Sequence, residues 1–275
     1  MRPRAPLNVL PFLLAAMLVT PAPVFPQAGG TLTASASTER IQARTYHFAE
    51  AGMEMPYELY VPTGYDGSQP TPLVVALHGL GSNPTQMIRY QGLTDLAEER
   101  GYIVVTPMGY NSRGWYGSRG PGRASERGDA ANDPDNLGVL SEQDVMNVLD
   151  LVRDELNIDS DRIYLMGHSM GGGGTWHIGI RNPELFAALG PVAPAIYTSP
   201  DALEAIRDVP VIVLMGDADE LVDVEVTRQW IARMGELGMT HSYIEISGGD
   251  HTGIIARTPS NMARIFDFFD QHSRN

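Results

Sequence analysis

The sequence predicts an α/β fold built on a mostly parallel, doubly wound sheet of about eight strands, with helices on both faces. Short apolar runs, of the kind that is buried on both faces of a parallel sheet, recur along the chain. Segments with apolar residues at helical spacing alternate with these runs. Neither an internal repeat nor a composition break interrupts the alternation, so one domain is expected over residues 41–275.

The first part of the chain is typical of a secretory signal peptide. Arg2 and Arg4 form a basic start, an apolar run follows over residues 9–19, and three prolines end it. Gln27-Ala28 offers a cleavage site, with a weaker alternative after Ala36. We therefore expect a signal peptide over residues 1–28, a polar linker over 29–40, and a secreted or periplasmic protein. A retained N-terminal anchor is the alternative.

The expected strands begin with a hairpin and continue as buried runs. The hairpin joins residues 41–48 and 55–61 at Ala51-Gly52. The later strands are expected at residues 73–77, 102–106, 162–166, 187–192, 211–215 and 242–246. Helices are expected at 85–100, ending at Gly101, at 141–156 with Ser141 as N-cap, and at 171–181, 224–237 and 259–272. Residues 108–136 form one long irregular stretch, and no large cap domain is expected.

Composition excludes several classes of function. The formal net charge is −14, so phosphate backbones and anionic membrane surfaces would be repelled. There is no cysteine, which excludes disulfides, thiolate metal sites and a cysteine nucleophile. All 19 basic residues are arginine, so lysine chemistry is excluded as well. The arginine bias is typical of a GC-rich genome, and salt tolerance is the alternative explanation.

One segment predicts a nucleophile. Residues 162–166 form an apolar strand, and Gly167-His168-Ser169-Met170-Gly171 follows directly before a glycine-rich helix start. This pattern forces Ser169 onto a tight strand-to-helix turn, where side chains at Gly167 and Gly171 would collide with neighbouring elements. The helix N-terminus beside Ser169 favours developing negative charge.

On these residues the chain resembles the α/β-hydrolase superfamily of serine esterases and peptidases, over roughly residues 41–272. The resemblance implies the order nucleophile, acid, histidine. Asp219, in a turn after a late strand, resembles the superfamily's acid, with Asp217 and Asp223 as competitors. His251 lies in a glycine-rich loop past the last strand and is the expected base.

The resemblance also implies an oxyanion hole. His78-Gly79-Leu80-Gly81 follows the buried strand 73–77 and resembles the His-Gly-x-Gly loop of the superfamily. The backbone N–H of Leu80, or of Gly79, would act together with that of Met170. His78 and His168 are expected to be structural.

The irregular stretch is expected to divide into two parts. Trp115 and Tyr116, with Gly79, are the expected substrate-binding residues, because large aromatic surfaces are costly to leave in water. Residues 117–136 are expected to form a mobile rim with nothing to anchor it. The stretch is rich in Asp and Asn, but its spacing does not match a calcium loop, so no metal and no cofactor are expected.

The whole pattern is most similar to the group of secreted polyhydroxybutyrate depolymerases, feruloyl esterases and acetyl xylan esterases. It is also similar to the catalytic domain of prolyl oligopeptidase-family peptidases. The resemblance implies a secreted serine carboxylesterase that acts on a small-molecule or oligomeric ester, with no nucleic-acid partner and no membrane partner after signal cleavage. A serine peptidase and a non-catalytic binding protein of hydrolase fold are the alternatives. The oligomeric state stays open.

Overall fold

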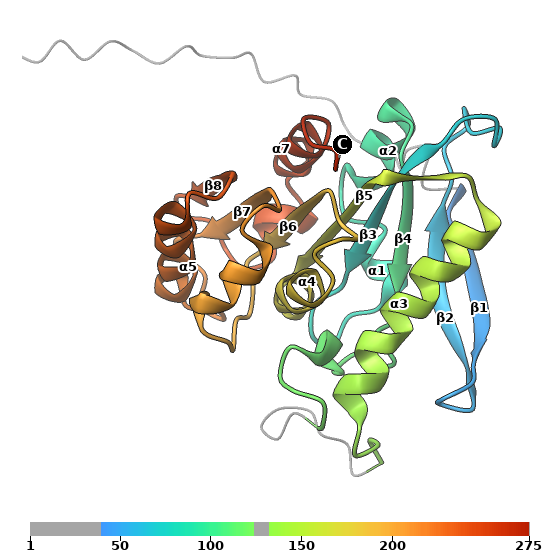
Figure 1. Ribbon diagram of the computed structural model, residues 1–275, viewed down its shortest axis with the longest axis horizontal. Helices are drawn as coiled ribbons and strands as arrows, with labels where there is room; N and C mark the ends of the chain where they lie inside the picture. The colour runs from blue at the N-terminus through green and yellow to red at the C-terminus, as the bar shows by residue number, and fades with distance from the viewer. Residues whose placement is uncertain (1–39, 124–131, 275) are drawn as a thin grey trace, which may run out of the picture. The chain divides into compact units, whose positions relative to one another are not determined.

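The computed structural model describes residues 40–123 and 132–274 of the chain (Figure 1). Its centre is an eight-stranded sheet with the strand order β1-β2-β4-β3-β5-β6-β7-β8. The expected signal peptide and nearly all of the expected linker lie outside the described residues. The predicted fold class, a mostly parallel sheet with helices on both faces, is confirmed.

All eight strands predicted from the sequence are present, in the same order along the chain. At one edge β1 (Gln42–Phe48) and β2 (Met53–Tyr60) form an antiparallel hairpin, and β2 runs antiparallel to β4 (Ile103–Pro107). The other neighbours are parallel: β3 (Thr71–Leu77), β5 (Ile158–His168), β6 (Ala188–Val192), β7 (Val211–Gly216) and β8 (His241–Ile246). The carboxyl ends of the parallel strands therefore meet at one edge, where α/β proteins bind ligands.

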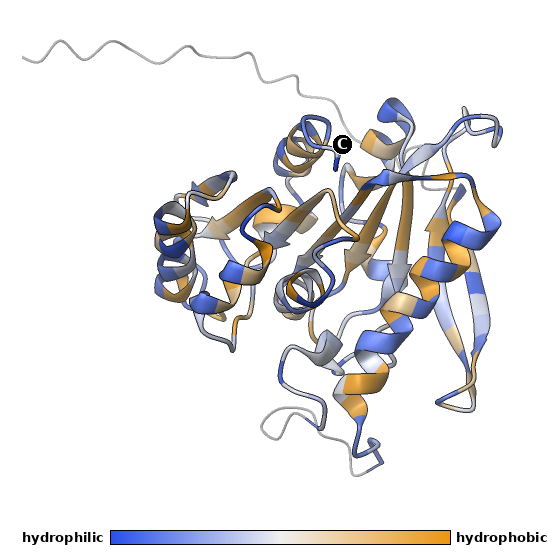
Figure 2. Cartoon of the chain, viewed as in Figure 1, coloured by the Kyte–Doolittle hydropathy of each residue, from blue (hydrophilic) through white to orange (hydrophobic). Residues whose placement is uncertain are grey.

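Two apolar cores lie on opposite faces of the sheet. Alternate residues of β3 point to each core, with Val75 in one and Val74 in the other. The first core is covered by α3 (Leu137–Glu155), α4 (Met170–Arg181) and α5 (Val224–Leu237), and the rings of Trp176 and Trp230 lie 4.7 Å apart in it. The second is covered by α1 (Pro84–Met87), α2 (Leu93–Arg100), α6 (Gly253–Ala256) and α7 (Pro259–Phe269). Figure 2 shows the apolar strands between helices whose outer faces are polar.

The helix expected over residues 85–100 is two helices. Gly92 has a φ of +89° and separates α1 and Tyr90 from α2. It packs closely on Pro259, because a Cβ at Gly92 would lie 3.1 Å from the Cβ of that proline. Gly101, with a φ of +73°, ends α2 as predicted. Contact with α7 thus sets the break, and the apolar spacing alone did not reveal it.

The N-cap predicted at Ser141 is wrong. Helix α3 begins at Leu137, so Ser141 lies inside it and is fully buried. Its hydroxyl donates to the carbonyl of Gly109 at 2.7 Å and accepts from the amide of Tyr116 at 2.9 Å. A serine that resembles a cap therefore joins the helix to the loop after β4. The short helix η3 (Pro200–Ile206), between β6 and β7, was not predicted.

None of the helices within residues 40–123 and 132–274 is both long enough and apolar enough to cross a membrane.

Candidate active site

Ser169 lies on a sharp turn between β5 and α4. Its φ of +60° and ψ of −115° are strained for a residue with a side chain. The turn depends on its flanking glycines. A Cβ at Gly167 would lie 2.3 Å from the carbonyl oxygen of Gly171, and one at Gly171 would lie 2.2 Å from that of Leu77. The collisions expected from the sequence are thus present, and Ser169 stands at the carboxyl end of a central strand.

Asp219 and His251 are in contact, although 31 residues separate them in the sequence. The Nδ1 atom of His251 lies 2.6 Å from Oδ2 of Asp219. The side chain of Asp219 is fully buried, and its Oδ1 accepts hydrogen bonds from the amides of Leu221 at 2.8 Å and Val222 at 2.9 Å. A carboxylate can only accept hydrogen bonds, so His251 donates through Nδ1–H and keeps its Nε2 lone pair available.

The two competing aspartates have other contacts. Oδ1 of Asp217 accepts from the amide of Gly248 at 2.6 Å, which joins the loop after β7 to the loop after β8. Asp223 is the N-cap of α5 and accepts from the amide of Glu225 at 2.9 Å. Of these three aspartates, Asp219 is the one whose carboxylate lies against His251.

The loop after β3 carries the amides expected to form an oxyanion hole. In the described part of the chain, the amides of Gly79, Leu80 and Met170 donate to no backbone carbonyl. Met170 is the first residue of α4, so its amide is one that the helix itself leaves without a partner. His78 is fully buried, and its ring nitrogens lie 2.8 Å from the carbonyl oxygens of Gly79 and Met108. Burial lowers the pKa of His78, and the two carbonyl contacts oppose that shift. The buried ring supports this loop through its contacts with Gly79 and Met108.

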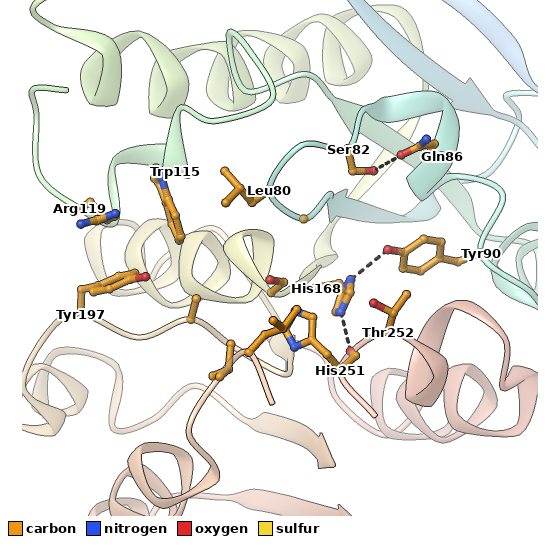
Figure 3. A pocket seen from close by; sticks show the side chains of 15 residues that line it. Leu80, Ser82, Gln86, Tyr90, Trp115, Arg119, His168, Tyr197, His251 and Thr252 are labelled. Carbon is orange, nitrogen blue, oxygen red and sulfur yellow. Dashed lines mark hydrogen bonds between the residues drawn. The ribbon is translucent and has the colours of Figure 1, made fainter. Parts of the chain in front are cut away.

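A cavity of about 740 Å³ opens over the serine (Figure 3). Ser169, His251, Gly79 and Leu80 are among the residues that line it. Most of the other lining residues were not predicted from the sequence: Ser82, Gln86, Tyr90, Arg119, His168, Ala195, Tyr197, Leu221, Val222 and Thr252. Most of them follow the carboxyl ends of β3, β6, β7 and β8. This position after a strand is the sequence feature from which they could have been predicted to line a ligand site.

Trp115 and Tyr116 have different surroundings. Both have positive φ, of 59° and 52°, in the short helix η2 (Trp115–Gly117), and this conformation sends neighbouring side chains in different directions. Trp115 lines the cavity, where its ring lies edge-on to that of Tyr197 at 5.3 Å, and the guanidinium of Arg119 lies over both rings.

The structure does not place Tyr116 in the cavity, which corrects the expectation that it binds substrate. Its side chain is fully buried, and its hydroxyl lies 3.3 Å from the carbonyl oxygen of His78. Tyr116 therefore supports the loop of Gly79 and Leu80 from the interior of the protein.

Part of the expected mobile rim is anchored. Arg113 binds the carboxylate of Asp133 through two hydrogen bonds of 2.7 and 2.6 Å, and Asn111 donates to the same carboxylate at 3.1 Å. The side chain of Asp133 is only 4% exposed. The statement that residues 117–136 have nothing to hold them is therefore wrong for Asp133, while residues 124–131 lie outside the described residues. Across the described ranges, no three acidic or histidine side chains are grouped as metal ligands.

Comparison with known proteins gives this site its context. A family model described as "Putative esterase" matches residues 49–236, more than half of the chain. The chain belongs to this family. The chain is 28% identical over 220 residues to the putative esterase NocK of Nocardia uniformis subsp. tsuyamanensis, and the match covers 80% of this chain and 58% of that protein.

A second relative is the bifunctional acetylxylan esterase/xylanase XynS20E of Neocallimastix patriciarum. It is 27% identical over 177 residues, which cover 64% of this chain and 23% of that protein. The chain therefore spans less than two thirds of the length of either relative.

Solved structures show the same fold. A thermostable esterase superposes with a TM-score of 0.65 at 26% identity, covering 86% of this chain and 64% of that one. A CE1 ferulic acid esterase from Anaeromyces mucronatus, in complex with ferulic acid, gives a TM-score of 0.64 at 19% identity, covering 87% and 93%. The chain thus belongs to an esterase family and has the α/β-hydrolase fold.

Proposed function

We propose that the esterase hydrolyses its substrate through an acyl-enzyme on Ser169, with His251 as base and Asp219 as the orienting acid. The observation that carries the proposal is the 2.6 Å contact between His251 and the buried Asp219, beside a cavity that Ser169 also lines. The strained turn at Ser169 supports the same assignment, because such backbone strain is typical of nucleophiles on this fold.

The reaction follows from the tautomer of His251. Its Nε2 takes the proton of Ser169 as Oγ attacks the ester carbonyl carbon, and Asp219 stabilises the imidazolium that forms. The tetrahedral intermediate collapses, the C–O bond to the alcohol breaks, and His251 returns the proton to the leaving alcohol. Water then attacks the acyl-enzyme with the same base, which releases the acid and restores Ser169.

The oxyanion forms beside the amides of Met170 and of Leu80 or Gly79. These amides have no backbone acceptor in the described part of the chain, so they can donate to the oxygen as its negative charge develops. One such donor contributes about 3 to 4 kcal/mol to stabilisation of the transition state.

We infer that the substrate is a small-molecule or oligomeric ester. A cavity of about 740 Å³ is within the range that holds a drug-sized molecule. Trp115 and Tyr197 offer aromatic surface at one end, whereas Ser82, Gln86 and Thr252 offer polar atoms elsewhere in the cavity. A relative named as a bifunctional acetylxylan esterase/xylanase and relatives named as cutinases support an ester substrate. The net charge of −14 argues against a nucleic-acid partner.

Replacement of the nucleophile tests the proposal. Ser169→Ala should reduce kcat for p-nitrophenyl acetate by roughly 10³-fold or more, since loss of the nucleophile leaves only the oxyanion hole and binding. Ser68→Ala, at an exposed serine that does not line the cavity, is the matched control and should keep the wild-type activity. Phenylmethylsulfonyl fluoride should add its mass to the peptide that carries Ser169. A Ser169→Ala variant with half of the wild-type activity would refute the assignment.

The substrate class needs a panel. p-Nitrophenyl acyl esters of rising chain length, methyl ferulate, an acetylated xylo-oligosaccharide and aminoacyl-nitroanilides should be compared by kcat/KM. We expect kcat/KM to be at least about tenfold higher for the esters than for the nitroanilides, the result that a cavity selective for esters would give. Equal or better cleavage of nitroanilides would favour a peptidase instead.

We also propose that the protein is exported through the segment 1–28, on the strength of its basic start and its apolar run. Fusion of residues 1–40 to a reporter that is active only outside the cytoplasm should give activity. A fusion that starts at residue 29 is the matched control and should give none.

A further inference from the structure

His168 lies directly before the proposed nucleophile, and its ring is packed between two cavity residues (Figure 3). Its Nε2 lies 2.8 Å from the backbone carbonyl oxygen of His251, and its Nδ1 lies 2.9 Å from the hydroxyl of Tyr90. The His168 and His251 rings are 4.9 Å apart, and the Tyr90 ring meets His168 edge-on at 5.8 Å. The residue is only 3% exposed.

These contacts fix the tautomer of His168. A carbonyl oxygen can only accept, so Nε2 of His168 carries the hydrogen that is donated to His251. In the neutral ring Nδ1 is then an acceptor, and the Tyr90 hydroxyl donates to it. Burial, with a smaller contribution from the neighbouring His251, lowers the pKa of His168 to about 4, which keeps the ring neutral above that pH.

Besides the side-chain contact of His251 with Asp219, several hydrogen bonds of this loop involve backbone groups on either side of the histidine. Before it, the amide of Gly249 donates to Ile246 at 3.0 Å and its carbonyl accepts from Ala218 at 3.3 Å. After it, the amides of Thr252 and Gly253 donate to the carboxylate of Asp250 at 2.9 and 2.5 Å. All of these bonds tie the loop to itself or to its neighbours at β7 and β8. The bond from His168 joins the loop to the turn that carries Ser169.

We propose that His168 is a positioning residue, which sets the distance between the His251 ring and Ser169 by holding the backbone carbonyl of His251. The inference rests on the proposed function, because it assigns a role toward the same serine and base. His168 itself exchanges no proton with the substrate. Tyr90 extends the arrangement, because its hydroxyl keeps Nδ1 of His168 as the acceptor and thereby keeps the donor on Nε2.

Substitution of His168 by glutamine or by asparagine distinguishes the hydrogen bond made by Nε2 from the one made by Nδ1. His168→Gln places an amide nitrogen near the position of Nε2 and can still donate to His251. His168→Asn is shorter, so its amide lies near the position of Nδ1 and does not reach that carbonyl. Fluorophosphonate titration should count competent sites in each variant, so that kcat is expressed per reactive serine and misfolded protein is left out.

We expect His168→Asn to lower kcat per titrated site by about 10- to 100-fold with little change in KM, because small displacements of reacting groups slow the chemical step. His168→Gln should restore kcat to within about threefold of the wild type. Tyr90→Phe should fall between these two variants, because the ring can then adopt the other tautomer. A purely structural role predicts loss of titratable sites and of melting temperature, with kcat per site unchanged.

Equal kcat per site in His168→Asn and wild type would overturn the inference, as would failure of His168→Gln to exceed His168→Asn. The result remains separable from the proposed function. If Ser169→Ala keeps its activity, the proposed function itself fails. If Ser169→Ala is inactive and His168→Asn is fully active, only the positioning role fails.

Discussion

Three hydrogen bonds converge on the carboxylate of Asp219, two from the amides of Leu221 and Val222 and one from His251. Because the side chain has no exposed surface, these donors take the place of water around a buried charge. The carboxylate is thereby fixed against His251, whereas Asp217 and Asp223 use their oxygens to stabilise turns. The three aspartates lie within seven residues, and their roles differ because different groups donate hydrogen bonds to their carboxylates.

Asp219→Asn should separate charge from shape at this position. The asparagine oxygen can keep the amides of Leu221 and Val222, which turns its NH₂ group toward Nδ1 of His251 and favours the wrong tautomer. We expect kcat for p-nitrophenyl acetate to fall by roughly 10³- to 10⁴-fold with melting temperature nearly unchanged. Asp217→Asn is the matched control and should change kcat by less than about threefold. Similar losses in both variants would refute the assignment of Asp219.

The loop after β4 is the segment whose conformation was least predictable from the sequence. Asp144 of α3 holds its start, since one carboxylate oxygen accepts from the amides of Gly109 at 2.6 Å and Tyr110 at 3.3 Å, and the other from the Tyr46 hydroxyl at 2.6 Å. Ser141, on the preceding turn of the helix, holds the next part of the loop. Helix α3 therefore serves as the template that places Trp115 at the cavity.

The carboxylate of Asp144 predicts a pH dependence of stability. Burial raises its pKa to about 6, despite the hydrogen bonds that lower it. A folded-state pKa above the unfolded value of about 3.9 means that the folded protein holds the proton more tightly, so stability present below about pH 4 is lost as pH rises through 6. The free energy of unfolding of Asp144→Asn, relative to wild type, should increase between pH 4 and 7.

Urea titrations at several pH values measure this difference. Leu151→Ala, at an exposed position of the same helix, removes no titratable group, so it is the control and should show an offset that does not vary with pH. A pH-independent offset for Asp144→Asn would show that its ionisation does not differ between the folded and unfolded chain.

Trp115 predicts an effect on specificity. Its ring lines the cavity and also packs against Tyr197, so truncation enlarges one end of the site. Trp115→Ala should change the ratio of kcat/KM between short and long p-nitrophenyl acyl esters by about fivefold or more, which corresponds to about 1 kcal/mol of differential binding. Leu151→Ala, on an exposed part of α3, should leave the ratio unchanged. An equal loss on every ester with a sharp fall in melting temperature would make Trp115 a packing residue.

At the scale of the whole molecule, the sequence predicted the features that follow from the parallel sheet, namely strands buried on both faces and catalytic loops at one edge. Val74 and Val75 are both buried because helices cover both faces, and such runs are visible as continuous apolar segments. Ser169 follows the central strand β5 and His251 follows the edge strand β8. Because the strands from β5 to β8 run parallel, both loops lie at the same edge of the sheet. Contacts between distant segments were not visible: the break at Gly92 depends on Pro259, and the burial of Tyr116 depends on α3 and His78.

The three tryptophans give the protein two separate optical reporters. Trp176 and Trp230 form a close pair in the core beneath α4 and α5, and both are at most 2% exposed, whereas Trp115 borders the cavity beside the cation of Arg119. Coupling of the paired indoles should give a circular dichroism band that disappears only when α4 separates from α5. Emission from Trp115 should instead respond to a molecule that enters the cavity. One unlabelled sample can therefore report loss of the fold and occupancy of the site by two independent signals.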